Sequence, residues 1–522
     1  MNDFGIPRRT LLGGALAAAA GATLSGCAGG GGAAGGGSTV GDTLTLVVPS
    51  GASTLDPAGG QNAFNQFYDL AYDSLLVQKV DGTYAPGLAT AWEYAPGNKK
   101  FSLTLRKGVK FSDGTALDAQ AVKTWIEHAL KLPGSAAPNY LGSLSGITVT
   151  DPQHLTLNFG KPTPQLEAVF SQALEMGMIG SPAAVKANSL QNATAGAGQY
   201  VLDKARTVSG DHYTFTPNPH YWNPSAIRWK KIVIRVMANA TTVLQSMKSG
   251  QVQFAAQQPL SSITPARQAG LQVTGAMQSF QGLAINDRAG TVVPALGKLE
   301  VRQAINHALD RKAINQAVYG GHGQPTAQPA IDGDDGYDAS LDDLYPYDPG
   351  KAKQLLKRAG YPNGFKVSLV AAAGLGMDQL AQAVAGQLAK VGITVTIDTK
   401  STLPEYFNAL SSGKYGLSTI GFGGLPAYFL YQLLIGPNAA LFNPFKTHSA
   451  QLDDWYQQLL PLTAEAGKPV ARKMVRYVTE QAWFAPVVAT PLVALSAKGV
   501  TGANASTTGR RLWYLPELKP SH

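Results

Sequence analysis

Residues 84–130 read “YAPGLATAWEYAPGNKKFSLTLRKGVKFSDGTALDAQAVKTWIEHAL”, a strand signal followed by a helix signal. In the segment 100–106, apolar residues occupy every second position, which predicts a half-buried strand. Asp118 then precedes an apolar stripe at helical spacing, made of Val122, Trp125, Ile126, Ala129 and Leu130. This stripe predicts an amphipathic helix that Asp118 caps at its N-terminus. The stretch therefore indicates a mixed α/β architecture.

Similar signals flank this stretch in the first part of the chain. Upstream, “DTLTLVVP” (42–49) predicts a strand and “AFNQFYDLAYDSLL” (63–76) predicts a helix. Downstream, “GITVTDPQHLTLNF” (146–159) predicts a hairpin of two alternating strands about an Asp151-Pro152 turn.

The second half of the chain repeats this style. Two helices are predicted to begin at aspartate caps and to end at glycines, one from Asp310 to Gly320 and one from Asp348 to Gly360. The strands “FKVSLV” (365–370) and “ITVTID” (393–398) enclose a predicted helix at 378–391. Strand–helix–strand units of this size predict α/β domains with largely parallel sheets.

The first 26 residues have the plan of an export signal. Arg8 and Arg9 form a short basic segment, and an uncharged apolar segment, residues 11–24, follows it. This order, ending in small residues, is typical of a signal peptide. A segment of this length is too short to span a bilayer core as a helix, which needs roughly 20 residues. We therefore predict that residues 1–26 direct the protein out of the cytoplasm.

The only cysteine of the chain, Cys27, ends the segment “LSGC” (24–27), which resembles the lipobox of bacterial lipoproteins. The resemblance implies that Cys27 carries a diacylglycerol on its sulfur and becomes the N-terminus after cleavage. The glycine-rich residues 27–41 cannot bury enough apolar surface to fold, so they predict a flexible tether. Arg8-Arg9 resembles a twin-arginine signal, and both this route and general secretion stay open.

The composition of the 522-residue chain limits its function classes. After Cys27 there is no cysteine, which excludes disulfides and a thiol nucleophile from the body. Hydrophobic residues make up 44% of the chain, enough for large cores, and the length predicts two or three domains. The net charge is +9, but the basic residues are scattered and no aromatics alternate with them. Nucleic acid is therefore not an expected partner.

Motifs for catalysis and metal binding are missing or incomplete. Ser411 and Lys414 have the spacing of a serine acylase but lack its companion motifs. The histidines show no paired spacing, and the acid-rich segment 332–343 lacks glycine at the sixth position that a calcium loop needs. We expect no enzymatic activity, no cofactor and no metal site, and we expect segment 332–343 to be a solvated loop.

Six segments, in this order, resemble the extracytoplasmic solute-binding proteins of family 5, the peptide and nickel type. They are “TLDPAGGQNAFNQFYDLAYDSLLV” (54–77), the stretch 84–130, “AGAGQYVLDKA” (195–205), “TFTPNPHYWNPSA” (214–226), “LEVRQAINHALDRKAINQAVYGGHG” (299–323) and “YDPGKAKQLLKRAGYPNG” (347–364). The resemblance extends over nearly the whole chain after the tether.

This resemblance implies a fold of the periplasmic-binding-protein type, class II, in its large three-domain form. Two α/β lobes would be joined by hinge strands, with an extra domain inserted in the first lobe. Lobe I would comprise residues 42–62, 199–275 and 494–522, the inserted domain residues 63–198, and lobe II residues 276–493. The ligand would lie between the lobes, which close over it.

The resemblance also implies a function without a chemical step. The protein would be a monomeric, lipid-anchored extracytoplasmic subunit that captures a small solute and delivers it to the permease and ATPase of an ABC importer. A sensor that feeds a receptor, or a member that binds nickel or a metal complex, stays an alternative. Most motif residues are expected to support turns and helices, namely Arg106, Phe111, Asp113, Gly114, Trp222 and Arg302.

Ligand-binding residues are expected on loops after strands that face the cleft. By position these are Ser50, Gly51, Ala52 and Ser53 after the first strand, Phe280, Gln281 and Asn286 in the crossover strand, and Gly421, Phe422, Gly423, Gly424 and Tyr428 in the stretch 419–429. Peptide-binding relatives usually carry an aspartate in this last stretch, paired with the α-ammonium of the peptide. Here no acid follows until Asp453. A buried ammonium without a carboxylate is costly, so we expect a ligand without a free α-amine.

Overall fold

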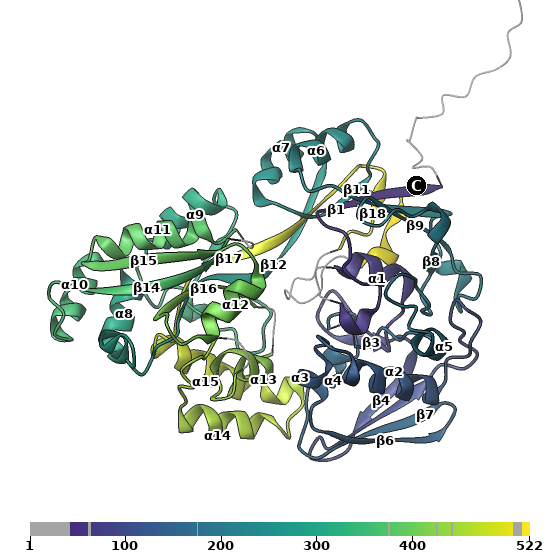
Figure 1. Cartoon of the computed structure of the whole chain (residues 1–522), viewed down its shortest axis with the longest axis horizontal. Coiled ribbons are helices and arrows are strands. Elements are labelled where there is room, and N and C mark those ends of the chain that lie inside the picture. The colour runs from purple at the N-terminus through teal and green to yellow at the C-terminus, as the bar shows by residue number, and fades with distance from the viewer. Residues whose placement is uncertain are drawn as a thin grey trace, which may run out of the picture. The chain divides into compact units, whose positions relative to one another are not determined.

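The structure is a computed structural model, and it describes residues 42–60, 64–174, 176–373, 376–423, 426–439, 442–504 and 514–521 (Figure 1). The predicted signal peptide, the lipidation site Cys27 and the tether lie outside these residues, as does the predicted site residue Gly424. Within the described ranges, no helix has both the length and the apolar character needed to cross a bilayer.

A mixed sheet of eleven strands organises the described chain. Its order is β15-β14-β16-β12-β17-β11-β1-β10-β9-β8, and β13 pairs with β17 off this path. The bounds are β1 (Thr43–Val48), β8 (Tyr200–Leu202), β9 (His212–Pro217), β10 (Lys231–Val236), β11 (Phe254–Gln258), β12 (Gln272–Ile285), β13 (Gln324–Pro325), β14 (Phe365–Ala372), β15 (Ile393–Lys400), β16 (Leu417–Phe422) and β17 (Phe484–Ser496).

The expectation of largely parallel sheets is wrong. In the main sheet only β1–β10, β1–β11, β14–β15 and β14–β16 pair in parallel among the described strands, whereas the other six pairings are antiparallel. Four of the six antiparallel pairings involve β12 or β17, which pass between two groups of strands and run against their neighbours. The other two join β9 to β10 and to β8. Strand direction is a tertiary property that alternation along the sequence does not encode.

Strands β12 and β17 join the two strand groups (Figure 1). One end of β12, Phe280–Ile285, pairs with β16, and most of its length pairs with β17. The far end of β17 reaches β11, where Ser496 lies opposite Phe254. The β12–β17 register shifts between Met277 and Ser279. A register irregularity bends a strand pair, so the two strands change direction where they leave one group for the other.

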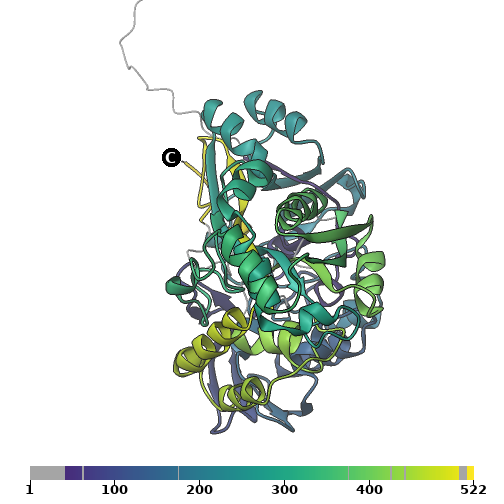
Figure 2. The same ribbon diagram turned by 90° about the vertical axis from the view of Figure 1, so that its left-hand side faces the viewer.

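Helices cover both faces of the strand group β14–β16. One face packs on α8 (Leu299–His307), α9 (Arg311–Tyr319), α10 (Pro349–Arg358) and α11 (Asp378–Ala389). The other face packs on α12 (Leu403–Ser411), α13 (Ala427–Leu430), α14 (Ala450–Leu459) and α15 (Ala464–Glu480). Helices α14 and α15, olive in Figure 2, pack against each other. The predicted aspartate caps are confirmed, since Asp310 accepts from Ala313 N and Asp348 accepts from Lys351 N.

Two hydrophobic cores belong to the strand group formed by β1 and β8–β11. Helices α6 (Ala240–Lys248) and α7 (Ile263–Gln268) pack on one side, and α1 (Asn65–Ala71) packs on the other. The predicted helix 63–76 is wrong beyond Ala71. Tyr72 is extended and fully buried, and its hydroxyl donates to Leu55 O at 3.0 Å, which holds the chain out of helical geometry.

A second, antiparallel sheet has the order β4-β5-β7-β6. Asp118 caps α2 by accepting from Ala121 N at 2.8 Å, and this cap, the strand at 100–105 and the hairpin at 144–159 confirm their predictions. The remaining elements are β2 (Leu76–Gln78), β3 (Tyr84–Pro86), β4 (Ala89–Tyr94), β5 (Lys100–Leu105), β6 (Leu144–Asp151), β7 (His154–Phe159), β18 (Val500–Thr501), β19 (Lys519–Pro520), α2 (Ala119–Lys131), α3 (Ala137–Leu141), α4 (Leu166–Val169) and α5 (Pro182–Lys186).

Candidate ligand-binding site

The predicted loop after β1 lies at the edge of the first strand group. Ser50 and Ser53 are exposed, whereas Gly51 and Ala52 are half-buried. A Cβ atom at Gly51 would lie 3.0 Å from Tyr213 Oη, so the loop packs closely on β9. Because β1 runs parallel to β10 and β11, the carboxyl ends of the three strands meet at this edge. Ligands of α/β folds bind at such edges.

The structure brings two other predicted segments together. Gln281 of β12 lies opposite Gly421 of β16, and Phe280 lies opposite Phe422. The Phe280 side chain is fully buried and packs edge-on against Phe484, with ring centroids 6.0 Å apart. The Phe280 side chain is therefore not available to a ligand, and its main chain lies between two paired strands. Phe422 is half-buried and packs at 6.5 Å from Phe442.

A cluster of uncharged polar side chains lies on the two long strands. Gln281 Nε2 donates to Ser279 Oγ at 2.8 Å and to Thr490 Oγ1 at 3.3 Å. Ser279 and Gln281 are half-buried, and Thr490 is 9% exposed. The amide of Gln281 and the hydroxyls of Ser279 and Thr490 can each donate and accept hydrogen bonds. We call Ser279, Gln281 and Thr490 the crossover cluster. Ser279 and Thr490 escaped the sequence analysis because no motif includes them.

Two glycines, Gly421 in β16 and Gly423 directly after it, allow this cluster to form. A Cβ atom at Gly421 would lie 2.3 Å from Met377 Cε and 2.5 Å from Gln281 Oε1. A Cβ atom at Gly423 would lie 2.9 Å from Ser279 Cα. Non-bonded carbon atoms need about 3.5 Å or more. A Cβ atom at Gly423 would therefore meet the backbone of β12, so this glycine allows close backbone approach. A Cβ atom at Gly421 would instead displace the side-chain ends of Gln281 and Met377.

Asn286 and Tyr428 lie apart from the crossover cluster. Asn286 is fully buried, where its amide donates to Tyr415 O and accepts from Ser418 Oγ. Tyr428 is buried against Phe429, with ring centroids 4.9 Å apart, and against Tyr456. The predicted site residues therefore divide into an exposed loop, a strand pair and two interior side chains.

No acid follows the glycine stretch in the sequence until Asp453, but the fold brings acids from another segment beside it. Asp334 and Asp335, from the acid-rich segment, lie with Phe422 and Gly423 around one small void. Asp335 Oδ1 accepts from Ala427 N at 2.8 Å, at the N-terminus of α13. A carboxylate is favoured at that position because the first N–H groups of a helix lack partners and carry partial positive charge.

The acid-rich segment 332–343 is not a solvated loop. Asp342 accepts from Thr326 Oγ1 at 2.7 Å, from Gln328 Nε2 at 2.8 Å and from Tyr337 Oη at 2.6 Å. Several carboxylates of the segment, those of Asp334, Asp335, Asp338 and Asp342, thus accept hydrogen bonds within the protein, which alternating acids and glycines do not reveal. Among the residues that the structure describes, no group of three or more His, Cys, Asp or Glu is arranged to hold a metal ion.

The Ser411 hydroxyl bonds a backbone carbonyl and not a side chain that could act as its base. It is exposed near the end of α12, and its Oγ donates to Asn408 O at 3.1 Å. Such bonds to a carbonyl three or four residues earlier are common for serine in helices. The Ser411–Lys414 spacing therefore has an ordinary local explanation.

The motif residues Arg106 and Trp222 contact each other. The Arg106 guanidinium lies 4.1 Å from the ring centroid of Trp222 and donates to Gly87 O at 3.1 Å. Trp222 Nε1 donates to Asp73 Oδ2 at 2.8 Å. Burial raises the pKa of Asp73 to about 6, against hydrogen bonds that lower it. Arg106 and Trp222 thus stabilise the packing of this part of the chain.

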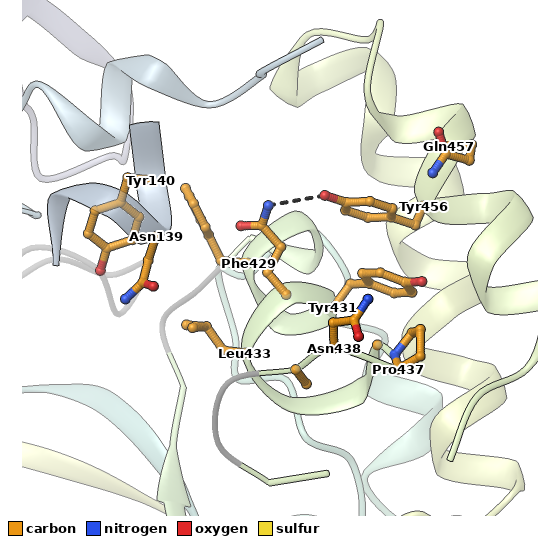
Figure 3. A pocket seen from close by; sticks show the side chains of 12 residues that line it. Asn139, Tyr140, Phe429, Tyr431, Leu433, Pro437, Asn438, Tyr456 and Gln457 are labelled. Carbon is orange, nitrogen blue, oxygen red and sulfur yellow. Dashed lines mark hydrogen bonds between the residues drawn. The ribbon is translucent and has the colours of Figure 1, made fainter. Parts of the chain in front are cut away.

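A cavity of about 420 Å³ lies where α3 meets the segment after α13 (Figure 3). We call it the interface cavity. Asn139 and Tyr140 line it from α3, while Phe429, Tyr431, Gln432, Leu433, Gly436, Pro437, Asn438, Ala439, Tyr456 and Gln457 line it from the other side. Tyr140 and Phe429 meet edge to face at its wall, with ring centroids 5.3 Å apart.

Aromatic rings build one wall of this cavity. Tyr456 stacks on Tyr431, with centroids 4.0 Å apart, and on Tyr428 at 5.5 Å. Gln432 Nε2 donates to the hydroxyls of Tyr428 and Tyr456 at 3.0 and 3.1 Å. Burial and the neighbouring Tyr456 raise the pKa of the Tyr428 phenol. Tyr428 therefore stays neutral and supports the wall.

Comparison with known proteins shows which protein family has this architecture. Residues 83–440 match the sequence profile of the bacterial extracellular solute-binding proteins, family 5. The glutathione-binding protein GsiB of Escherichia coli K12 is 25% identical over 498 residues, which cover 91% of this chain and 92% of GsiB.

Solved structures show the same fold. AgaA from A. tumefaciens R10, in complex with agropinic acid, is 25% identical with a TM-score of 0.76, covering 92% of this chain and 99% of its own. DppA from Helicobacter pylori, in complex with the peptide STSA, is 21% identical with a TM-score of 0.74, covering 92% and 98%. The fold is therefore of the periplasmic-binding-protein type. The chain belongs to the bacterial extracellular solute-binding proteins of family 5, whose members bind small ligands and work with the permease and ATPase components of ABC importers.

Proposed function

We propose that this chain is the lipid-anchored substrate-binding subunit of an ABC importer, and that it closes two lobes over one small solute. Lobe I comprises residues 42–62, 199–275 and 494–522, and lobe II comprises residues 276–493. The inserted domain comprises residues 63–198. The two long strands β12 and β17 serve as the hinge, because together they connect the two strand groups. Strand β12 pairs with β16, β17 pairs with β11, and β12 and β17 pair with each other.

The observation that carries the proposal is the crossover cluster. Gln281 bonds Ser279 on its own strand and Thr490 on the neighbouring strand, within lobe II and near the end at which both strands leave it. Polar groups placed there can bond a ligand that contacts both lobes. A ligand that bonds both lobes stabilises the closed state over the open state, which is the thermodynamic requirement for closure.

The ligand of this site is proposed to lack a free α-amine. The stretch 419–429 has no carboxylate of its own, and the crossover cluster is uncharged. Asp335, which lines the small void beside Gly423 together with Asp334, already accepts from Ala427 N. Leaving a buried ammonium without its partner costs about 3–5 kcal/mol, or roughly two to three and a half decades of affinity.

Two measurements test this proposal. Native mass spectrometry of protein purified without refolding identifies any retained ligand. Calorimetry then measures the affinity of that ligand, and of free and N-acetylated di- to pentapeptides, for the wild type, Gln281→Ala and Asp335→Asn. We expect Gln281→Ala to weaken the retained ligand about tenfold, and free-amine peptides to bind weakly. Micromolar binding of a free peptide that acetylation abolishes contradicts the ligand class, and its loss in Asp335→Asn identifies the carboxylate responsible.

The anchor forms a separate part of the proposal. The lipobox-like “LSGC” and the glycine-rich residues after it support lipidation of Cys27 and a position outside the cytoplasmic membrane. A lipid anchor holds the binding protein close to its permease, which raises the effective concentration of the pair.

A further inference from the structure

The interface cavity carries features of a binding site that is separate from the crossover cluster. Its lining contains no charged residue, although the chain carries a net charge of +9. None of its lining residues belongs to the crossover cluster. The volume of 420 Å³ falls within the roughly 300–1,000 Å³ typical of small-molecule sites.

Three residues that line this cavity have side-chain amides whose hydrogen-bonding groups are unused. Asn139, Asn438 and Gln457 are exposed. Among the described residues none of the three makes a side-chain hydrogen bond, unlike Gln432, which is held by two tyrosine hydroxyls. Each amide offers two N–H donors and one carbonyl acceptor. Together they can bond several hydroxyl groups of one ligand.

The backbone around the cavity has an uncommon geometry. Residues Tyr431–Ile435 form a π-helix directly after α13. Such turns are rare and often lie at functional sites. Gly436 ends the turn, where a Cβ atom would lie 2.7 Å from Tyr431 Cε1. Tyr431 is held in place because its hydroxyl donates to Asp453 Oδ1 at 2.6 Å. The aromatic wall is therefore fixed before any ligand arrives.

We propose that the interface cavity binds a neutral saccharide. A sugar ring combines hydroxyl groups, which the three free amides can bond, with C–H faces, which can pack on Phe429, Leu433 and Tyr140. A charged ligand would lose its hydration without meeting an opposite charge, which is unfavourable. A saccharide seated here contacts α3 of the inserted domain and the π-helix of lobe II together.

The test uses the full chain and six probes: glucose, maltose, lactose, cellobiose, glucosamine and glucuronate. Saturation-transfer NMR detects binding, and calorimetry measures affinity for the wild type, Asn139→Ala, Gln457→Ala and the crossover-cluster variant Gln281→Ala. Asn139→Ala and Gln457→Ala truncate exposed side chains, and circular dichroism checks that the fold of each variant is unchanged. Gln120→Ala, an exposed glutamine on α2 outside the cavity, is the matched control.

We expect at least one neutral sugar to bind, and the two charged sugars to bind at least about tenfold more weakly. Asn139→Ala and Gln457→Ala should each weaken the neutral sugar about five- to tenfold, and Gln120→Ala should not. No binding by any neutral sugar, or equal binding by the charged sugars, overturns the proposal. Loss of sugar binding in Gln281→Ala but not in Gln457→Ala places the sugar at the crossover cluster instead. That outcome overturns the second site and leaves the proposed function standing.

Discussion

The side-chain amide of Asn98 donates a hydrogen bond of 2.9 Å to Leu460 O, 362 positions further along the chain. The same Nδ2 atom donates to Leu462 O at 3.1 Å. Asn98 has a left-handed backbone, with φ of 53°, and is 5% exposed. The carbonyl groups at the end of a helix lack intrahelical partners. Leu460 and Leu462 follow the end of α14, and the Asn98 amide bonds both of their carbonyl oxygens. It joins the turn before β5 to the proposed second lobe.

Replacing Asn98 by glycine should lower the free energy of unfolding by about 1–3 kcal/mol, the cost of leaving buried polar groups unbonded. Glycine keeps the left-handed backbone accessible, so the change reports the hydrogen bonds alone. Urea titration measures the difference. Asn188→Gly is the matched control, because Asn188 is exposed and also left-handed, with φ of 50°. Equal stabilities of the two variants would refute the role of Asn98.

Replacing Gly421 by alanine should weaken ligand binding at least about tenfold, or by about 1.4 kcal/mol. The new Cβ atom would meet Gln281 Oε1 and Met377 Cε, so the crossover cluster must rearrange. Calorimetry with the retained ligand measures the change. Gly386→Ala on α11 is the control, since a Cβ atom there meets nothing within 4 Å. Unchanged affinity in Gly421→Ala would mean that the ligand binds elsewhere.

The stability contributed by Asp73 should fall as the pH rises from about 4 to about 6. Burial raises the pKa of Asp73 from its ordinary 3.8 to about 6 in the folded protein. A raised carboxyl pKa means that the folded state binds the proton more tightly, so this contribution is complete below the unfolded pKa and is lost above the folded pKa. The size is about 3 kcal/mol, at 1.36 kcal/mol per unit.

The measurement is the free energy of unfolding of the wild type minus that of Asp73→Asn, at several pH values. Asparagine does not titrate, so the other ionisable groups cancel in the difference. The difference should decrease across this pH range. A constant difference would show that Asp73 titrates normally despite its burial.

Local features of the fold follow from the sequence because they depend on neighbouring residues. Asp118, Asp310 and Asp348 cap helices as predicted, since a cap bonds a backbone N–H three residues on. Tyr72 shows the limit of this reasoning. The apolar pattern predicts a helix through Tyr72, but the helix ends at Ala71. The buried hydroxyl of Tyr72 bonds Leu55 O instead, a contact set by tertiary packing.

The candidate site depends on distant parts of the chain. The pairing of Gln281 with Gly421 requires the β12–β16 register, and the contact of Gln281 with Thr490 requires β17 beside it. Asp335 reaches Ala427 from a segment that precedes it by several elements. The sequence indicates which glycines and aromatic residues belong to such a site. It does not show which acids or hydroxyls lie beside them.

Cys27→Ser should leave the protein unanchored or unprocessed. Serine lacks the thiol that accepts the diacylglycerol, so the several acyl chains needed for a durable anchor would be missing. Partition between membrane and soluble fractions after export measures the effect. Equal partition of the variant and the wild type would refute the lipid anchor.

Closure of the two lobes over one ligand is tested most directly by small-angle X-ray scattering. The radius of gyration is measured with and without a saturating amount of the ligand that native mass spectrometry identifies, for the wild type and for Gln281→Ala at the same ligand concentration. We predict that the wild type becomes more compact at saturation and that its melting temperature rises, because the ligand binds only the native state. An unchanged radius of gyration in wild-type protein that calorimetry shows to be saturated would contradict hinge closure.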